Sequence, residues 1–388
     1  MLSTDKIREG EHIMNIHTLN QNAYMYSIHT LELGIRLKSY TYGKLIKILT
    51  DYSGKYHFCY YSPENCPSIL VFDMFKDFGF TYCYARYLCA KDHPYSSHCF
   101  YMIINPRRLL HIPDYQYICI TPPERIKDII PYIMTLFENL GVDFINYDKT
   151  LFVKRLDFCT NIKLDNAEMT REYMRLLCKG KYIFRASRRL QYSPVGHRKI
   201  YSKQDFTITG ANFELSIYNK KEQMELSSFS YPYEEQKLSD NQIRIELRIF
   251  YPRLYHLKQT YGTAEGLFNY IPELSQRYMD RYLQAAYGKG DFHQYNIAVN
   301  IIKDSSFHDS TKSHMIRFMK KISKTSLQEA INFFKEETDF PDITFILNKF
   351  NELQISPITI SQKSNYAILR HPIHYIQTQN VNLSPYLE

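Results

Sequence analysis

Charged and apolar residues alternate along three short stretches of the chain, with the period of two that a β-strand imposes on its two faces. The polar faces carry Arg155 and Asp157 in residues 151–159, Glu214, Ser216, Tyr218 and Lys220 in residues 213–220, and Arg244, Glu246 and Arg248 in residues 243–249. If the three strands are neighbours in one sheet, these side chains gather on one face. Carboxylates, cations and a tyrosine in one place are the groups that a phosphodiester-cleaving site needs.

Each group has a defined role in such a site. Asp157 and Glu246 would hold a hard divalent cation, Mg²⁺ or Mn²⁺, through their oxygens. The cation and the basic side chains would offset the charge that develops on phosphate while Tyr218 attacks. The alternative is a solvent-facing ladder of salt bridges, with Arg155 paired to Asp157 and Arg244 paired to Glu246. The sequence alone does not decide between them, because it does not prove that the strands are adjacent.

A second feature that suits a polyanion is the segment from Cys178 to Lys203, which holds eight basic side chains and no acid in a chain of formal net charge +8. The basic residues are Lys179, Lys181, Arg185, Arg188, Arg189, Arg198, Lys199 and Lys203, interleaved with Tyr182, Phe184, Tyr192 and Tyr201. Cations neutralise phosphates and aromatic faces stack on unpaired bases, so the mixture favours a DNA strand as the partner. A solvated basic loop is the alternative.

The elements that would position these residues follow an α+β pattern. Strands are predicted at 27–38, 80–88, 98–104, 151–162, 212–219 and 243–250, with 80–88 and 98–104 as a hairpin. A helix is predicted from a capping box of Thr121 and Glu124 to Gly141, and Pro131 predicts a kink or break within it. A second amphipathic helix is predicted over 165–178, with Asp165 as its cap.

After Pro252 the apolar spacing becomes helical, over residues 254–262, 264–287, 313–322, 326–337 and 343–353. We therefore predict an antiparallel-sheet catalytic domain with flanking helices over residues 1–251 and a mostly helical domain over residues 252–388. A helix-turn-helix within residues 326–360 would let the second domain recognise double-stranded DNA. Plain packing helices are the alternative for the same residues.

Cysteine usage and hydropathy indicate the compartment. Eight Cys stand at irregular spacings, residues 1–14 are charged and lack an apolar signal region, and no apolar run approaches the ~20 residues of a membrane helix. Reduced thiols in a cytoplasm, without membrane contact, are therefore expected. Cys83, Cys89, His93, His98 and Cys99 lack a paired Cys-x-x-Cys, so buried thiols are favoured there over a zinc site.

Four blocks in order resemble the rolling-circle replication initiators of small Gram-positive plasmids, of the trans-acting type, and the related filamentous-phage-type replication proteins. Residues 103–109 (Ile-Ile-Asn-Pro-Arg-Arg-Leu) are similar to the family's strand that ends in Asn-Pro. Residues 154–158 (Lys-Arg-Leu-Asp-Phe) are similar to the family's Thr-Arg-Leu-Asp-Leu block. Residues 214–221, with the core Ile-Tyr-Asn-Lys-Lys, resemble the block of the catalytic tyrosine. Residues 243–248 resemble its Arg-Val-Glu strand. Together the blocks span residues 100–250.

The resemblance implies a DNA nickase that initiates replication by transesterification. Tyr218 would attack a phosphodiester of the plus-strand origin, leaving a 5′-phosphotyrosine and a 3′-hydroxyl that primes synthesis. Lys220 would assist loss of the phenolic proton, since the free pKa of tyrosine is ~10, and Asp157 and Glu246 would be the metal or catalytic carboxylates. The expected DNA contacts are Arg155, Arg244, Arg248 and Lys221, with Arg185, Arg188, Arg189, Arg198 and Lys199 of the basic segment.

Three departures from the family pattern bear on the site. Ser216 stands where the family has an arginine two residues before the tyrosine, which removes one phosphate contact. Residues 181–212 do not align with the family's preceding strand. No His-hydrophobic-His motif is present, because His371-Pro-Ile-His374 has the wrong spacing for a strand pair, so a carboxylate-held metal is expected and its third ligand is unnamed.

The implied partners are origin DNA, as duplex and as extruded single strand, with a host DNA polymerase and a separate helicase, and a homodimer is compatible with the sequence. A helicase is expected because the chain has no GxxxxGK[ST] phosphate loop. Two other functions remain open. A mobilisation relaxase would use the same tyrosine chemistry for DNA transfer. A non-catalytic origin-binding protein would use the basic segment and the helical third, with Tyr218 as a packing residue.

Overall fold

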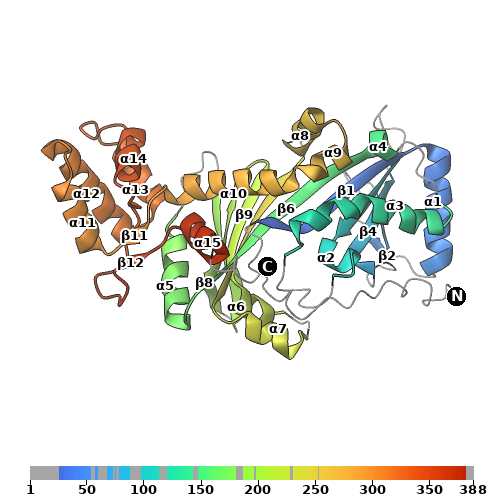
Figure 1. The fold of residues 1–388 in the computed structure, drawn as a ribbon, viewed down its shortest axis with the longest axis horizontal. Helices are drawn as coiled ribbons and strands as arrows, with labels where there is room; N and C mark the ends of the chain where they lie inside the picture. The colour runs from blue at the N-terminus through green and yellow to red at the C-terminus, as the bar shows by residue number, and fades with distance from the viewer. Residues whose placement is uncertain are drawn as a thin grey trace.

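The structure is a computed structural model that describes residues 26–53, 57–59, 68–72, 75, 78–87, 98–112, 120–142, 147–180, 187–195, 198–227, 230–251 and 253–381. Its centre is a ten-stranded sheet in the order β2-β3-β4-β5-β1-β6-β10-β9-β8-β7 (Figure 1). Every neighbouring pair is antiparallel. The α+β class predicted from the sequence is confirmed.

The strands of this sheet run over the following residues: β1 Ser27–Leu37, β2 His57–Cys59, β3 Ser68–Phe72, β4 Phe80–Tyr87, β5 His98–Ile104, β6 Leu151–Lys163, β7 Ser187–Val195, β8 Arg198–Thr209, β9 Phe213–Asn219 and β10 Gln242–Phe250. The six strands predicted from alternation are all present, and β4 and β5 pair as the expected hairpin. A small second sheet joins β11 (Phe292–His293) to β12 (Ile368–Leu369).

The helices of the first part of the chain are α1 Ser39–Ser53, α2 Pro106–Leu109, the 3₁₀ helix η4 Pro123–Asp128, α3 Ile129–Asn139, α4 Tyr147–Thr150, α5 Ala167–Leu177, α6 Lys220–Glu225 and α7 Tyr233–Leu238. The later helices are α8 Arg253–Tyr261, α9 Ala264–Asn269, α10 Ile271–Tyr287, α11 Tyr295–Asp304, α12 Asp309–Lys324, α13 Leu327–Lys335, α14 Ile343–Glu352 and α15 Pro372–Val381. Among the helices that the structure describes, none combines the length and the apolar character that crossing a bilayer requires.

Helices cover one face of the sheet, and that face forms the main core. Alternate residues of each central strand point into it, among them Leu33 of β1, Phe158 of β6, Ile217 of β9 and Leu247 of β10. α10 packs on β1 and β6, and α5 on β8, β9 and β10 (Figure 1). The period-two alternation therefore sends the intervening residues, which include the predicted site, to the opposite face.

Two helix starts differ from the prediction. The predicted capping box is wrong, because the Oγ1 of Thr121 has no hydrogen-bond partner among the described residues and the segment begins at Pro123 as a 3₁₀ helix. The α-helix starts only at Ile129, which puts Pro131 in its first turn, where a missing N–H costs no helical hydrogen bond. α5 is capped by Asn166, whose side chain accepts from the Met169 amide, and not by Asp165.

The C-terminal third is mostly helical, as predicted. The single helix expected over 264–287 is divided into α9 and α10 at Tyr270, with Pro272 in the first turn of α10. Residues 326–360 contain α13 and α14, so the helices of the predicted helix-turn-helix exist, while their role in reading duplex DNA stays a prediction. The domain boundary near residue 251 also stays a prediction. α10 and α15 beyond it share the core under the sheet.

Candidate active site

The three polar strands are neighbours, in the order β6-β10-β9. Glu246 of β10 lies opposite Ser216 of β9, and Arg244 lies opposite Tyr218. On the other side, Arg248 of β10 lies opposite Asp157 of β6. The adjacency that the sequence left open is therefore present, and the charged residues and Tyr218 share the sheet face that lies away from the main core.

Tyr218 is bonded directly to one of the predicted carboxylates. Its phenolic Oη donates to Oε1 of Glu246 at 2.6 Å, which is the contact expected between a nucleophile and its general base. Burial, followed by the negative charge of Glu246, raises the pKa of Tyr218 well above 10, so the resting side chain is a neutral phenol. Burial opposes ionisation of Glu246, but the positive charges of Arg244 and Lys220 and the hydrogen bond from the Tyr218 hydroxyl outweigh it and lower the pKa of Glu246. The pair is a phenol donor on a carboxylate base.

Lys220 reaches the same place by a route other than the predicted one. β9 ends at Asn219, whose side chain caps α6 by accepting from the amides of Lys221 and Glu222, so Lys220 is the first helical residue and not a strand residue. Its ammonium nevertheless lies 6.0 Å from the centre of the Tyr218 ring. The side chain is buried and donates to Gln223 Oε1 at 2.9 Å.

The charge of Lys220 is sensitive to pH near neutrality. Burial and the neighbouring Arg244 lower its pKa to about 7, against the opposing pull of Glu246 and Glu235. An ammonium with this pKa is close to half ionised at neutral pH. It can therefore stabilise a developing phenolate at acidic and neutral pH, and this stabilisation is lost as the pH rises.

Arg244 lies behind Glu246 and is fully buried. Its Nε donates to Asn161 Oδ1 at 2.9 Å, and its Nη1 lies 3.9 Å from Glu246 Oε1. The side chain has no exposed surface, so the predicted phosphate contact is not available to it in this arrangement. Its position is that of a fixed positive charge that holds the Glu246 carboxylate ionised.

Asp157 is held between two arginines. Its Oδ1 lies 3.0 Å from Arg155 Nε and 3.3 Å from Arg248 Nε, and Arg248 also donates to Glu214 at 2.7 Å. The Arg155 pair is an ion pair without an aligned hydrogen bond. Burial raises the pKa of Asp157 to about 6, with both arginines opposing and Glu246 adding to the rise. The sequence alternative, a ladder of salt bridges, is thus present around Asp157 alongside the Tyr218–Glu246 pair.

One site residue that the sequence reasoning missed is Asp205. It lies on β8 directly opposite Tyr218 of β9. Among the residues that the structure describes, its buried Oδ1 has no hydrogen-bond partner, and burial together with Glu246 and Glu222 raises its pKa to about 7. The signal was available, since Asp205, Thr207 and Thr209 alternate with the core residues Phe206 and Ile208, but it fell within the segment that did not align with the family.

The second missed residue is His29 of β1. The β1–β6 register shifts between Ile28 and Thr30, so a β-bulge at His29 interrupts the alternation that the sequence reasoning assumed. Burial and the nearby Arg244 lower the pKa of His29 to about 3, so the ring is neutral. Glu246 is among the charges that act on it, which puts a neutral imidazole at the edge of the site.

The donor types fit a hard divalent cation. Asp157, Asp205 and Glu246 supply oxygens, His29 supplies a ring nitrogen, and the unpartnered Oδ1 of Asp205 is an atom that a cation would satisfy. Within the described ranges, however, no three His, Cys, Asp or Glu side chains are grouped closely enough to hold a metal ion as they stand. The metal predicted on Asp157 and Glu246 therefore remains a proposal.

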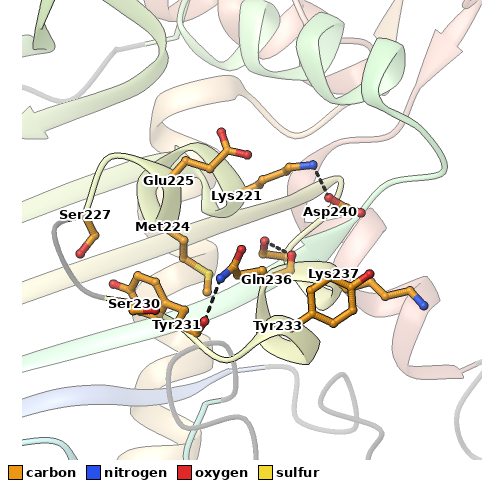
Figure 2. A pocket seen from close by; sticks show the side chains of 11 residues that line it. Lys221, Met224, Glu225, Ser227, Ser230, Tyr231, Tyr233, Gln236, Lys237 and Asp240 are labelled. Carbon is orange, nitrogen blue, oxygen red and sulfur yellow. Dashed lines mark hydrogen bonds and ion pairs between the residues drawn. The ribbon is translucent and has the colours of Figure 1, made fainter.

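Lys221 lies away from the tyrosine. Its ammonium is paired with Asp240 at 2.7 Å, and both side chains are about half exposed. It lines a cavity of about 480 Å³ between α6 and α7, which Figure 2 shows with Glu225, Tyr233 and Gln236 around it. Its predicted contact with DNA would have to compete with this ion pair.

The basic segment lies at the edge of the sheet. β7 is the outer strand, and its backbone carries Arg188 and Arg189 while Arg198 and Lys199 begin β8. Arg185 falls outside the described residues. Lys179, the first cation of the segment, donates to the Ser323 carbonyl at the end of α12 at 2.8 Å. The DNA-binding role predicted for the rest of the segment stays a prediction.

The structure also shows the surroundings of Ser216, which departs from the family pattern, and of two cysteines that were predicted to be buried. Ser216, at the position of the family's arginine, is hydrogen-bonded to Thr207 Oγ1 at 3.0 Å, so serine completes a neutral link between β9 and β8. Cys83 and Cys99 are buried, as predicted for packing side chains, while Cys89 and His93 lie outside the described residues.

The chain has one weak structural relative among the comparisons with known proteins. No protein-family model matches it, and no curated protein matches it significantly. Among solved structures it is similar to a rolling circle replication initiator protein from Geobacillus stearothermophilus, with 10% sequence identity, over 87% of this chain and 99% of that chain, at a TM-score of 0.30. A TM-score this low says nothing about the function of this chain. The residues of the site are therefore the basis of the function proposed below.

Proposed function

We propose that the protein is a site-specific DNA nickase that initiates rolling-circle replication, with Tyr218 as its nucleophile. The observation that carries the proposal is the 2.6 Å hydrogen bond from the Tyr218 hydroxyl to Glu246, on a sheet face lined by basic groups. Buried tyrosine hydroxyls generally need a hydrogen-bond partner, and Tyr26 has one in Asp280. What sets Tyr218 apart is that its carboxylate partner lies beside the buried Arg244 and that the Lys220 ammonium lies near its ring. The order of the four sequence blocks supports DNA as the substrate.

The proposed reaction transfers one phosphodiester to tyrosine. The Tyr218 oxygen attacks phosphorus, the phenolic proton passes to the Glu246 carboxylate, and the bond from phosphorus to the 3′-oxygen breaks. The 3′-oxygen takes a proton from water and leaves as a 3′-hydroxyl, while the 5′-phosphate stays on the tyrosine. Glu246 then gives the phenolic proton to the hydroxide left from that water, so the proton balance is closed. One ester replaces another, so neither ATP nor a redox partner is needed. The reverse reaction rejoins the strand.

The neighbouring cations act on the charge of this reaction. The Lys220 ammonium, 6.0 Å from the ring centre, favours the phenolate that forms as the proton leaves. Arg155 and Arg248, which are partly exposed beside Asp157, would contact the phosphate oxygens. Fixed positive groups in a site of low water content stabilise a phosphoryl transition state more than free ions in solution do.

A divalent cation, Mg²⁺ or Mn²⁺, is part of the proposal. Asp157 and Glu246 would hold it, and Asp205 adds a third carboxylate with an unsatisfied oxygen. When bound, the cation supplies positive charge beside the scissile phosphate. Binding of the cation can be measured without an activity assay, as a shift of the melting temperature or as broadening of the electron paramagnetic resonance signal of Mn²⁺. Loss of that signal in Asp205→Asn would support Asp205 as a ligand.

The deciding experiment uses a supercoiled plasmid that carries the cognate origin, with Mg²⁺ or Mn²⁺ present. We expect nicked circles with protein covalently attached, no product with Tyr218→Phe, and full activity with the matched control Tyr233→Phe on exposed α7. Nicking that survives Tyr218→Phe would refute the assignment. Binding of the origin without any nicking would favour the non-catalytic function, and nicking confined to a transfer origin would favour the relaxase.

The proposal has further parts. They are the recognition of duplex DNA by residues 326–360, the use of a host helicase and DNA polymerase, and a homodimer.

A further inference from the structure

A row of aromatic residues crosses the sheet on the same face as Tyr218. Tyr84 of β4 lies opposite Tyr101 of β5, Tyr101 lies opposite Gly34 of β1, and Gly34 lies opposite Phe152 of β6. The glycine makes room for its neighbour, because a Cβ at Gly34 would come within 2.3 Å of the Phe152 ring. The four positions thus form one register line, with the rings closing over the glycine.

The row continues at both ends onto exposed rings. Tyr82 lies 6.0 Å from Tyr84, the rings of Tyr84 and Tyr101 stack at 4.7 Å, and Tyr101 lies 6.1 Å from Phe152. Beyond Phe152 come Tyr251 at 6.5 Å and then Tyr255 of α8 at 5.6 Å from Tyr251. We call these six residues the aromatic row. Tyr84 and Tyr101 are buried and Phe152 is partly buried, whereas Tyr82, Tyr251 and Tyr255 are 37, 42 and 43% exposed.

Cations accompany the rings along this row. The Lys154 ammonium lies 4.8 Å from the Tyr101 ring and 5.3 Å from the Tyr84 ring, and the Arg36 guanidinium lies 5.5 Å from the Phe152 ring. Lys154 is also bound to Glu32 at 2.6 Å, which fixes it over the aromatic surface. The exposed Arg36 is the cation of this group that can reach a ligand.

The row belongs to the same surface as the candidate active site. Tyr84 and Tyr101 form a small cluster with Phe152 that is separate from the main core. Along β6, Phe152, Arg155 and Asp157 follow one another on this face, so Arg155 lies between the aromatic row and the ion pairs around Asp157. Phe152 at the exposed part of the row and the ion pairs around Asp157 therefore lie along one face of β6.

We propose that the exposed part of the aromatic row, formed by Phe152, Tyr251 and Tyr255 with Arg36, binds single-stranded DNA by stacking on its bases. Unpaired bases offer flat faces for stacking, whereas the bases of a duplex are already stacked inside it, and the accompanying cations meet phosphates. The identity of the strand, DNA next to the nicked bond, rests on the proposed function. Binding of the strand does not require that Tyr218 react.

A single tryptophan tests this proposal directly. The chain has no Trp, so Tyr251→Trp introduces the only indole and reports stacking by fluorescence quenching. The measurement is made in a Tyr218→Phe background, with an oligothymidylate and with a duplex of equal length. We expect strong quenching by the single strand and little by the duplex. Tyr40→Trp is the matched control, since Tyr40 is 84% exposed on α1 and is not part of the aromatic row, so it should not be quenched.

Affinity provides the second readout. Tyr251→Ala combined with Tyr255→Ala should weaken single-strand binding by roughly 5- to 150-fold for each base stack that is lost. The dependence of affinity on salt should stay unchanged, because no phosphate contact is removed. Tyr40→Ala should bind like the parent protein.

Three results would overturn the proposal: bound single strand without quenching at Tyr251→Trp, equal quenching at Tyr40→Trp, or parental affinity in the double alanine variant. An absence of single-strand binding would overturn it as well. Failure of the proposed nicking is seen separately, in the plasmid assay with Tyr218 intact. Quenching with no nicking would leave the aromatic row standing and refute only the catalytic function.

Discussion

Replacement of Glu246 by glutamine is the sharpest test of the site. The substitution keeps the shape of the side chain and an oxygen that can accept from Tyr218, but it removes the charge and the ability to take a proton. At pH 7 a phenol of pKa ~10 is ionised to about one part in 10³, and the pKa of Tyr218 lies well above that value. Loss of the Glu246 charge also lowers the pKa of Tyr218, and this offsets part of the loss in nicking rate. We therefore expect nicking to slow by about 10²- to 10⁴-fold, the usual contribution of a general base.

The pH dependence separates loss of a base from general damage. Glu246 has a lowered pKa, so the parent protein should have its base ionised throughout the range from about pH 5 to 6.5, in which Lys220 keeps most of its charge. The glutamine variant depends instead on spontaneous phenolate. Its rate should rise about tenfold per pH unit over the same range. The assay is single-turnover formation of the covalent protein–DNA product.

The control for Glu246→Gln is Glu214→Gln. Glu214 lies on the same sheet face and pairs with Arg248, but it does not touch Tyr218. It should lower the rate little and leave the pH dependence of the parent protein. Since Glu246 is also a proposed cation ligand, the measurement is repeated over a wide range of Mn²⁺ concentration. A rate that recovers with Mn²⁺ but not with pH, or a rate equal to that of the parent protein, would refute Glu246 as the base.

Three further predictions concern neighbouring residues. Asp205→Asn should stabilise the cation-free protein above pH 7 and change its stability little near pH 4, because the folded pKa of about 7 makes the wild-type protein less stable as the pH rises from the unfolded pKa through 7. The pKa shift corresponds to at most ~4 kcal/mol, which partial exposure reduces to about 1–2 kcal/mol. Melting curves of the variant and the parent protein that coincide at both pH values would contradict this prediction. Lys220→Arg should remove the decline in nicking above pH 7, about tenfold per unit in the parent protein, because arginine stays charged; an unchanged profile would show that the Lys220 charge is not used. Arg244→Met should lower the free energy of unfolding by about 3–5 kcal/mol in denaturant titrations, because it removes one partner of a buried charge pair, and a loss below about 1 kcal/mol would show that the pair is not structural.

The alternation of the strands could be read from the sequence, and so could the side chains that share their polar faces. Glu246 and Arg248 had to lie on one face of β10, and Asp157 on the corresponding face of β6, because the side-chain period of a strand is fixed by the backbone. The same reasoning failed where the backbone is irregular. Lys220 leaves β9 for α6, since Asn219 caps a helix there.

Tertiary structure alone decided which of these residues meet. Asp205 and Tyr218 face each other because β8 pairs with β9 in one register, and a shift of one residue would have turned Asp205 into the core. His29 approaches Glu246 because β1 is a neighbour of β6 and carries a bulge, a connection between residues far apart in the chain. Strand order and register depend on the packing of the whole sheet and not on local pattern. The sequence therefore determined the chemistry on each strand, whereas packing determined that Tyr218 is bonded to Glu246.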